Sequence, residues 1–314
     1  MLGPPAHPAF DPTCLHLAAD LRRLGIEPTR GAWHQVRHGV WVRADAFAAM
    51  DPLHRHAALV HASALTRRGP GELVFAREAA AALWGLPRIT PWPTHVHHLV
   101  TRRGVSGATV LRPFLGTEAE PVDVDGLLVT SVARTVVDLA RTGTLHDAVT
   151  AADHALRHGL CTRAELLDEA TSIPARGHGR GAAGLVAELA DGRSMSHGES
   201  LSRVQMFVLR LPRPELQVAF HDDLGHIGDT DFGWKGVAGE FDGRLKYRVP
   251  PGGSAQDVER VVWAEKKRED RLRRQARVAR WVWAEAVQKY RLAAILAQVG
   301  ITPERRSAWF DLGA

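Results

Sequence analysis

The segment Asp231-Phe232-Gly233-Trp234, followed shortly by Gly239-Glu240-Phe241-Asp242-Gly243, carries three acidic residues within twelve positions of otherwise apolar, glycine-punctuated sequence. Carboxylates are rarely placed in such surroundings without a partner or a metal ion. The flanking pattern predicts strands over residues 227–232 and 237–241. On that reading Asp231 ends one strand, while Glu240 and Asp242 share a face of the next. If the two strands are neighbours, the three carboxylates converge at one end of a sheet.

The sequence around this segment predicts an α/β domain. We expect a helix over 199–211, a strand over 216–220, a long helix over 254–277, a strand over 278–283 and a closing helix over 284–299. The resulting order of elements is α, β, β, β, α, β, α. This order is typical of a mixed sheet flanked by helices.

Three converging carboxylates predict a site for a hard divalent cation. Mg²⁺, or Mn²⁺ in its place, binds a few carboxylate oxygens and keeps water positions open for a nucleophile and a phosphate. The predicted ligands are Asp231, Glu240 and Asp242. Glu199 has two interpretations: a fourth carboxylate of the site, or an acid that complements the helix macrodipole. The alternative for the three acids is that they are solvated strand ends.

A run of cations follows the acidic segment, with eight Lys and Arg residues between Ala264 and Trp281. A polyanion such as DNA is the partner that this run favours, and the predicted contacts are Lys267, Arg268, Arg271 and Arg274. The cation that offsets charge on a reacting phosphate is expected to be Lys246 or Lys266.

Two acids interrupt the apolar side of the long helix. Glu265 and Glu269 lie on the same side as Leu272, where core residues are expected. They either pair with basic residues or line the edge of the site. A simpler interpretation of the whole run is a solvated helix in which Glu269 and Arg273 pair at i, i+4.

The front of the chain predicts a second DNA contact. A helix over 14–24 leads into a basic hairpin over 33–43, which favours a winged-helix-like segment in which Arg37 and Arg43 contact DNA. An ordinary αβ cap is the alternative. We expect a tail and this segment over 1–52, an α+β middle domain over 53–172, a glycine-rich linker with the start of a helix over 173–190, and the acidic domain over 191–314.

Composition supports a globular, non-membrane chain. The 314 residues exceed one ordinary domain, and 40 Lys and Arg against 35 Asp and Glu give a net charge of +5. The sequence contains no apolar run of about eighteen residues and no secretory signal at its start. We therefore expect a cytoplasmic protein with no membrane partner.

Several segments carry a family resemblance. Residues 198–203, 231–232, 239–243, 265–272 and 280–281 resemble the very-short-patch-repair-like branch of the PD-(D/E)XK, restriction-endonuclease-like superfamily. The chain is similar to multi-domain actinobacterial proteins that carry such a domain at the C-terminus. In those proteins the front part often resembles the AbiEi antitoxin of type IV toxin–antitoxin systems. The matching segments here are 39–43, 78–87 and 130–140.

This resemblance implies a Mg²⁺-dependent nuclease fold that binds DNA, with a cognate toxin as a further partner. Asp231 matches the first acid of the family motif and Glu240 matches the second. Asp242 stands where the motif has Lys, and Thr230 stands where it has Pro. Members of this branch commonly carry an acid at the Lys position. Either another cation substitutes for that Lys, or the domain only binds DNA.

Three functional hypotheses follow. The first is a DNA endonuclease that hydrolyses phosphodiesters with Mg²⁺ at Asp231, Glu240 and Asp242. The second is a non-catalytic, DNA-binding regulator of the AbiEi antitoxin type, in which the nuclease-like domain is degenerate. The third is an interaction module whose basic helix binds a protein partner.

Overall fold

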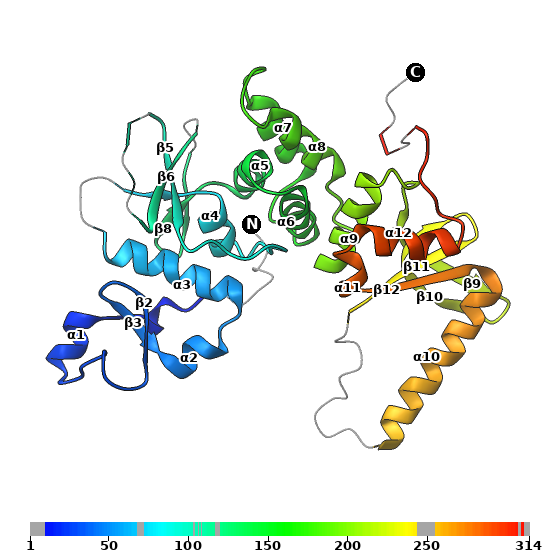
Figure 1. Ribbon diagram of the computed structural model, residues 1–314, viewed down its shortest axis with the longest axis horizontal. Helices are drawn as coiled ribbons and strands as arrows, with labels where there is room; N and C mark the ends of the chain where they lie inside the picture. The colour runs from blue at the N-terminus through cyan, green and yellow to red at the C-terminus, as the bar shows by residue number, and fades with distance from the viewer. Residues whose placement is uncertain are drawn as a thin grey trace. The chain divides into compact units, whose positions relative to one another are not determined.

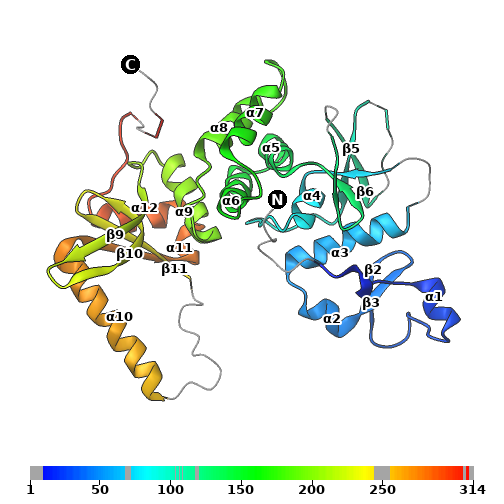
Figure 2. The ribbon, with the colours of Figure 1, turned by 180° about the vertical axis from the view of Figure 1, so that it is seen from behind.

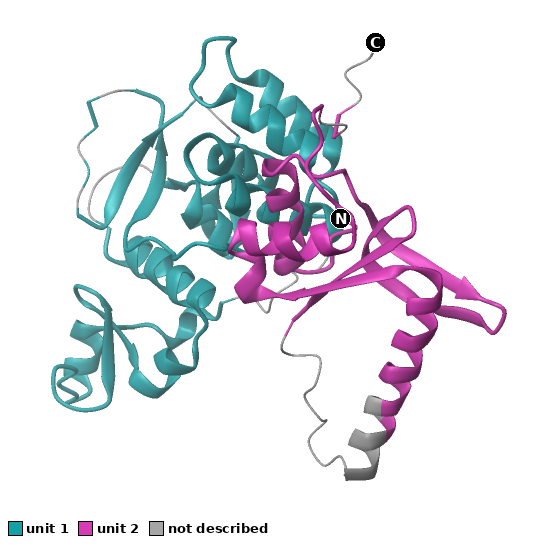
Figure 3. Cartoon of the chain, turned by 45° about the vertical axis from the view of Figure 1, so that its right-hand side comes forward, with its two compact units in different colours: residues 1–192 teal, residues 193–314 magenta. Residues whose placement is uncertain are grey.

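Figure 1 shows the computed structural model, which describes residues 10–67, 72–102, 104–105, 107, 109–116, 120–243, 255–306 and 309–310. The chain divides into two compact units, unit 1 over Met1–Gly192 and unit 2 over Arg193–Ala314, which Figure 3 draws in separate colours. Both units mix helices and strands. No helix in the described ranges is long and apolar enough to cross a membrane.

Unit 1 begins with a three-stranded antiparallel sheet in the order β1-β3-β2. Its elements are η1 (Pro12–Cys14), β1 (His16–Leu17), α1 (Ala18–Arg23), β2 (Trp33–Arg37), β3 (Val40–Arg43), α2 (Ala44–Ala49) and α3 (Pro52–Leu65). The predicted hairpin is confirmed, and Gly39 supplies the positive φ (+82°) that its turn requires. The predicted helix over 14–24 is shorter than expected, because His16 and Leu17 pair with β3 and the helix starts only at Ala18.

The middle of unit 1 is a five-stranded mixed sheet followed by helices. The strand order is β6-β5-β4-β8-β7. The strands are β4 (Val74–Phe75), β5 (Val96–Val100), β6 (Leu111–Leu115), β7 (Val122–Val124) and β8 (Leu127–Val129), and the helices are α4 (Glu78–Leu83), α5 (Val132–Thr142), α6 (Leu145–Arg157), α7 (Arg163–Ser172) and α8 (Arg180–Leu189).

The segment 173–190, expected to be a glycine-rich linker with the start of a helix, lies entirely in unit 1. Its second half forms α8, which packs against α5, α6 and α7 and buries Ala183, Val186, Ala187 and Leu189. The division between the units follows Gly192. The expected start of the last domain at residue 191 lies two positions before the start of unit 2 at Arg193.

Unit 2 is a four-stranded mixed sheet flanked by helices, as the order of elements predicted. The sheet order is β12-β11-β10-β9, with β11 and β12 parallel and the other pairs antiparallel. Its elements are α9 (His197–Val208), β9 (Glu215–Asp222), β10 (Gly225–Trp234), β11 (Val237–Asp242), α10 (Ala255–Gln275), β12 (Arg277–Val282), α11 (Trp283–Ala286) and α12 (Lys289–Gln298). The single closing helix that we expected is divided into α11 and α12.

The two faces of this sheet are covered by different helices. On one face, Leu272 of α10 and Ala276, which directly follows the helix, pack with Ile227 and Ala238 of the strands. Helices α9, α11 and α12 pack together on the other face, where the Trp281 indole N–H donates to the Ser202 hydroxyl at 2.8 Å. Helix α10 runs past the edge of the sheet in both views (Figures 1 and 2).

Helix α9 lies so close to the sheet that Gly198 has no room for a side chain. A Cβ built there would lie 2.0 Å from the Phe241 ring, which is only 7% exposed. Gly184 of α8 is the matched contrast, because a Cβ there meets nothing within 4 Å. The glycine at 198 is therefore explained by packing.

We predict opposite effects of alanine at these two glycines. Gly184→Ala should stabilise the protein by about 0.5–1 kcal/mol, because alanine is a better helix former. Gly198→Ala should destabilise it by about 1–3 kcal/mol, because the methyl group overpacks the contact with Phe241. Differential scanning calorimetry of both variants measures the shifts in melting temperature. A stabilised Gly198→Ala protein would contradict the packing described here.

Candidate functional site

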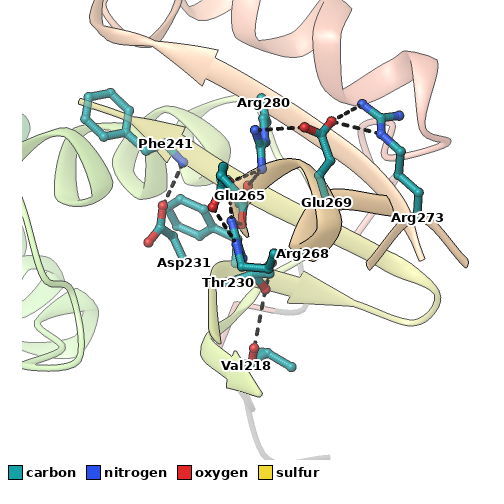
Figure 4. Close-up of polar contacts among 11 residues, drawn as sticks. Val218, Thr230, Asp231, Phe241, Glu265, Arg268, Glu269, Arg273 and Arg280 are labelled. Atoms are coloured by element: carbon teal, nitrogen blue, oxygen red, sulfur yellow. Dashed lines mark hydrogen bonds and ion pairs between the residues drawn. The ribbon is translucent and has the colours of Figure 1, made fainter. Parts of the chain in front are cut away.

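Asp231 and Glu240 lie on adjoining antiparallel strands, as the sequence predicted. The paired register of β10 and β11 runs to Phe232 opposite Gly239, and its continuation places Asp231 opposite Glu240. Asp231 was expected at the end of its strand, but β10 continues to Trp234. The Asp231 Oδ2 atom accepts the Phe241 backbone N–H at 2.7 Å (Figure 4). The side chain thus occupies the place of a strand-to-strand hydrogen bond where the paired register stops.

The Glu240 carboxylate is held between two arginines. Its Oε1 lies 2.7 Å from Arg268 Nη2 of α10, and its Oε2 lies 2.6 Å from Arg280 Nη2 of β12. Arg280 stands opposite Glu240 in the parallel β11–β12 ladder. The Glu240 side chain is 11% exposed. A carboxylate at this depth needs such partners, because an unpaired buried charge is strongly destabilising.

Two further glutamates extend this ion-pair network along α10 (Figure 4). Glu265 contacts Arg268 at 2.9 Å and Arg280 at 3.0 Å. Glu269 contacts Arg280 at 3.3 Å and Arg273 at 2.6 Å. The hydrogen bond from Arg268 is the largest cause that lowers the pKa of the Glu265 carboxyl. The same bond is the largest cause that raises the pKa of the Arg268 guanidinium. The acids on the apolar side of the helix therefore pair with basic residues, and the expected Glu269–Arg273 pair is confirmed.

The expected metal site is not assembled within the described ranges. No group of three or more His, Cys, Asp or Glu side chains there is placed to hold a metal ion. Both oxygens of Glu240 contact guanidinium groups, whose charge opposes that of a divalent cation. Asp242 ends β11 and is half-buried. As arranged, Asp231, Glu240 and Asp242 do not fit Mg²⁺ or Mn²⁺.

Glu199 takes part in local contacts at the start of α9. It is 6% exposed, and its Oε2 accepts the Met195 backbone N–H at 2.7 Å and the Gln217 side-chain amide at 3.0 Å. Gln217 lies in β9 with a φ of +54°, which is uncommon outside glycine. Backbone strain of this kind is often found at functional sites. Sequence reasoning missed Gln217, because a glutamine within a strand pattern gives no signal of a positive φ.

The expected DNA contacts of α10 divide into two groups. Lys267 and Arg274 are exposed, as is Lys266, whose ammonium lies 5.3 Å from the Trp263 ring centroid. Arg268 is held by Glu240 and Glu265. Arg271 makes a bidentate ion pair with Asp222, at 2.8 and 2.5 Å, and its hydrogen bonds lower the pKa of Asp222 to about 2. Arg268 and Arg271 therefore each form ion pairs within unit 2.

The hairpin arginines also differ from each other. Arg43 is exposed, 3.5 Å from Asp45 and 5.8 Å from the centroid of the Trp33 ring. The Nη1 of Arg37 is buried without a hydrogen-bond partner, and this burial lowers the pKa of Arg37. Arg43 is thus the more exposed of the two hairpin arginines. Lys246, a candidate for the charge-stabilising cation, lies outside the described residues.

Comparisons with known proteins identify relatives in Mycobacterium tuberculosis. The uncharacterized protein MT2308 of strain CDC 1551 / Oshkosh is 30% identical over 240 residues, which cover 74% of this chain and 83% of that protein. The uncharacterized protein Rv2248 of strain ATCC 25618 / H37Rv matches with the same identity and coverage. No family model matches the chain.

The ion-pair network predicts a difference between two arginines of α10. Arg268→Met should destabilise the protein by about 1.5–3 kcal/mol, because it leaves Glu240 buried with one partner fewer. Arg273→Met should cost less than about 1 kcal/mol, because the Arg273 side chain is 57% exposed and its ion pair with Glu269 is at the surface. Urea denaturation of the two variants measures both values. Equal costs would show that Glu240 does not depend on Arg268.

Proposed function

This chain belongs to the same family as the two Mycobacterium tuberculosis proteins, and from that premise we propose that it is a DNA-binding regulator that does not cleave DNA. Unit 2 would have a degenerate restriction-endonuclease-like fold of the very-short-patch-repair-like branch, and unit 1 would be AbiEi-like. The element order of unit 2 and its motif residues support the first assignment. The three-stranded sheet with its basic hairpin supports a winged-helix-like segment in unit 1.

The outer side of α10 is the surface that we propose for DNA. Trp263, Lys266, Lys267 and Arg274 are all exposed, opposite the side on which Leu272 is buried. Lys and Arg side chains bind phosphates through charge, and an exposed aromatic ring offers a face for a base. The cations of this stripe are spaced along one helix, so they can follow a phosphate backbone.

The proposal that the protein does not cleave DNA is supported mainly by the ion pairs of Glu240 with Arg268 and Arg280. A carboxylate that binds two guanidinium groups does not offer both oxygens to a divalent ion. Asp242 at the Lys position of the motif adds a second departure from an active site. A regulator of this type would act in the cytoplasm, with a toxin protein as a further partner.

The endonuclease hypothesis is the second candidate, and one observation favours it. Asp231 and Glu240, which match the two acids of the family motif, stand opposite each other where the paired register of two adjoining strands stops. Cleavage would require the Glu240 carboxylate to exchange arginine contacts for another partner. Direct assays separate the two candidates.

We predict that DNA affinity depends on the outer stripe of α10. In a plot of the logarithm of the DNA association constant against the logarithm of the salt concentration, the slope is negative. The Lys267→Ala/Arg274→Ala variant should make this slope shallower by about 2, since each lost phosphate contact removes about 0.9 on duplex DNA. Fluorescence anisotropy with a labelled duplex at several salt concentrations measures this slope. The matched control is Arg291→Ala, an exposed arginine on α12. An unchanged slope in the double variant would move DNA binding to another surface.

We also predict that the purified protein leaves supercoiled and linear DNA intact in Mg²⁺ or Mn²⁺. Asp231→Asn should bind the labelled duplex as tightly as the wild type, because Asp231 is not part of the basic stripe. Agarose gels and anisotropy measure the two results. Cleavage by the wild type that Asp231→Asn abolishes and Arg291→Ala retains would establish the endonuclease instead.

A further inference from the structure

Unit 1 contains a cavity of about 690 Å³ that the DNA-binding proposal does not use. It lies among β2, α2, α3 and the segment that follows α4. Its size is within the range of about 300–1,000 Å³ found for small-molecule sites. The polar and aromatic side chains that line it include Phe47, Arg55, His56, Arg88 and Trp92.

His56 is the polar group whose hydrogen bonding is incomplete. It is 3% exposed, and its ring stacks on Trp92 with centroids 5.0 Å apart. Burial, the largest cause, lowers the pKa of His56 to about 4, so the imidazole is neutral near pH 7. Its ring bonds to the Pro93 carbonyl, while Nε2 is buried with no hydrogen-bond partner. A neutral ring that donates through one nitrogen can only accept at the other.

The charge of the cavity wall is positive. Its lining residues include two arginines and no Asp or Glu. Arg88 is balanced by Glu78 at 3.1 Å and Asp147 at 3.4 Å. Arg55 donates to the carbonyls of Phe47 and Ala48 and to no carboxylate among the described residues. The charge of the exposed Arg55 is therefore available to an anion.

We propose that this cavity binds a small anionic heteroaromatic molecule of the nucleoside monophosphate class. The base would donate an N–H to His56 Nε2, and the phosphate would bind Arg55. Because Nε2 is covered and the His56 ring stacks on Trp92, this mode of binding requires the half-buried Trp92 ring to move aside. This site is separate from the α10 stripe, so its test does not depend on DNA binding.

Isothermal titration calorimetry of the full chain with AMP, GMP, CMP and UMP tests the proposal. At least one of these nucleotides should bind, while the nucleoside alone and ribose 5-phosphate alone should bind at least about tenfold more weakly, since each lacks one half of the contacts. Single-stranded oligonucleotides present the same bases and phosphates as free nucleotides, so a separate titration with them distinguishes a nucleic-acid ligand from a small molecule. Binding of oligonucleotides without any mononucleotide would overturn a small-molecule site.

Variants locate the site. Arg55→Gln should weaken the binding of the best nucleotide by about tenfold, the loss expected for one charged hydrogen bond. Arg22→Gln, an exposed arginine of α1, is the matched control and should bind as the wild type does. His56→Leu should also weaken binding, and circular dichroism checks that it folds. Nucleotide binding that Arg55→Gln leaves unchanged, or the absence of binding by all four nucleotides, would overturn the proposal.

Discussion

The structure of unit 2 depends on the Glu240 carboxylate and its two arginines. Glu240 lies on β11, Arg268 on α10 and Arg280 on β12, so one buried charge connects three elements that are distant in sequence. Removing a carboxylate from water is costly, and good geometry with two guanidinium groups is what offsets that cost. Glu265 and Glu269 then balance the arginines. The same helix is also held by Leu272, which is 1% exposed, so charge and apolar packing fix α10 in one register.

The ion pairs of Glu240 bear on whether the resemblance to a nuclease family implies hydrolysis. The motif residues are defined by identity, and the structure adds only that Asp231 and Glu240 lie on neighbouring strands. A motif does not specify whether a carboxylate faces a metal or an arginine, because both partners satisfy the same negative charge. Here the arginine partners are supplied by α10 and β12, the two elements that follow the motif. The resemblance therefore supports the fold of unit 2 more directly than it supports hydrolysis.

Most of the fold of unit 2 could be predicted from the sequence, and most of its site could not. Alternation and turn residues determine strands locally, and β9, β10 and β11 follow one another as adjacent antiparallel strands. The partners of Glu240 are instead 28 and 40 positions away, among eight cations that look alike in sequence. Spacing alone cannot tell which of them turns inward. The packing of α8 in segment 173–190 could not be predicted for a related reason, since its burial depends on helices elsewhere in the chain.

The basic run of α10 divides according to the geometry of a helix packed on a sheet. Residues on the inner side, such as Arg268, meet carboxylates that the sheet brings there, and their charge is neutralised within the molecule. Residues on the outer side, such as Lys267 and Arg274, are exposed and keep theirs. Seven Lys and Arg residues against five Asp and Glu in the helix would suggest only a small positive charge. Two of these five acids, Glu265 and Glu269, lie in the ion-pair network, whereas Asp270 is exposed beside the outer cations. The outer stripe therefore keeps a positive charge that the buried side of the helix does not.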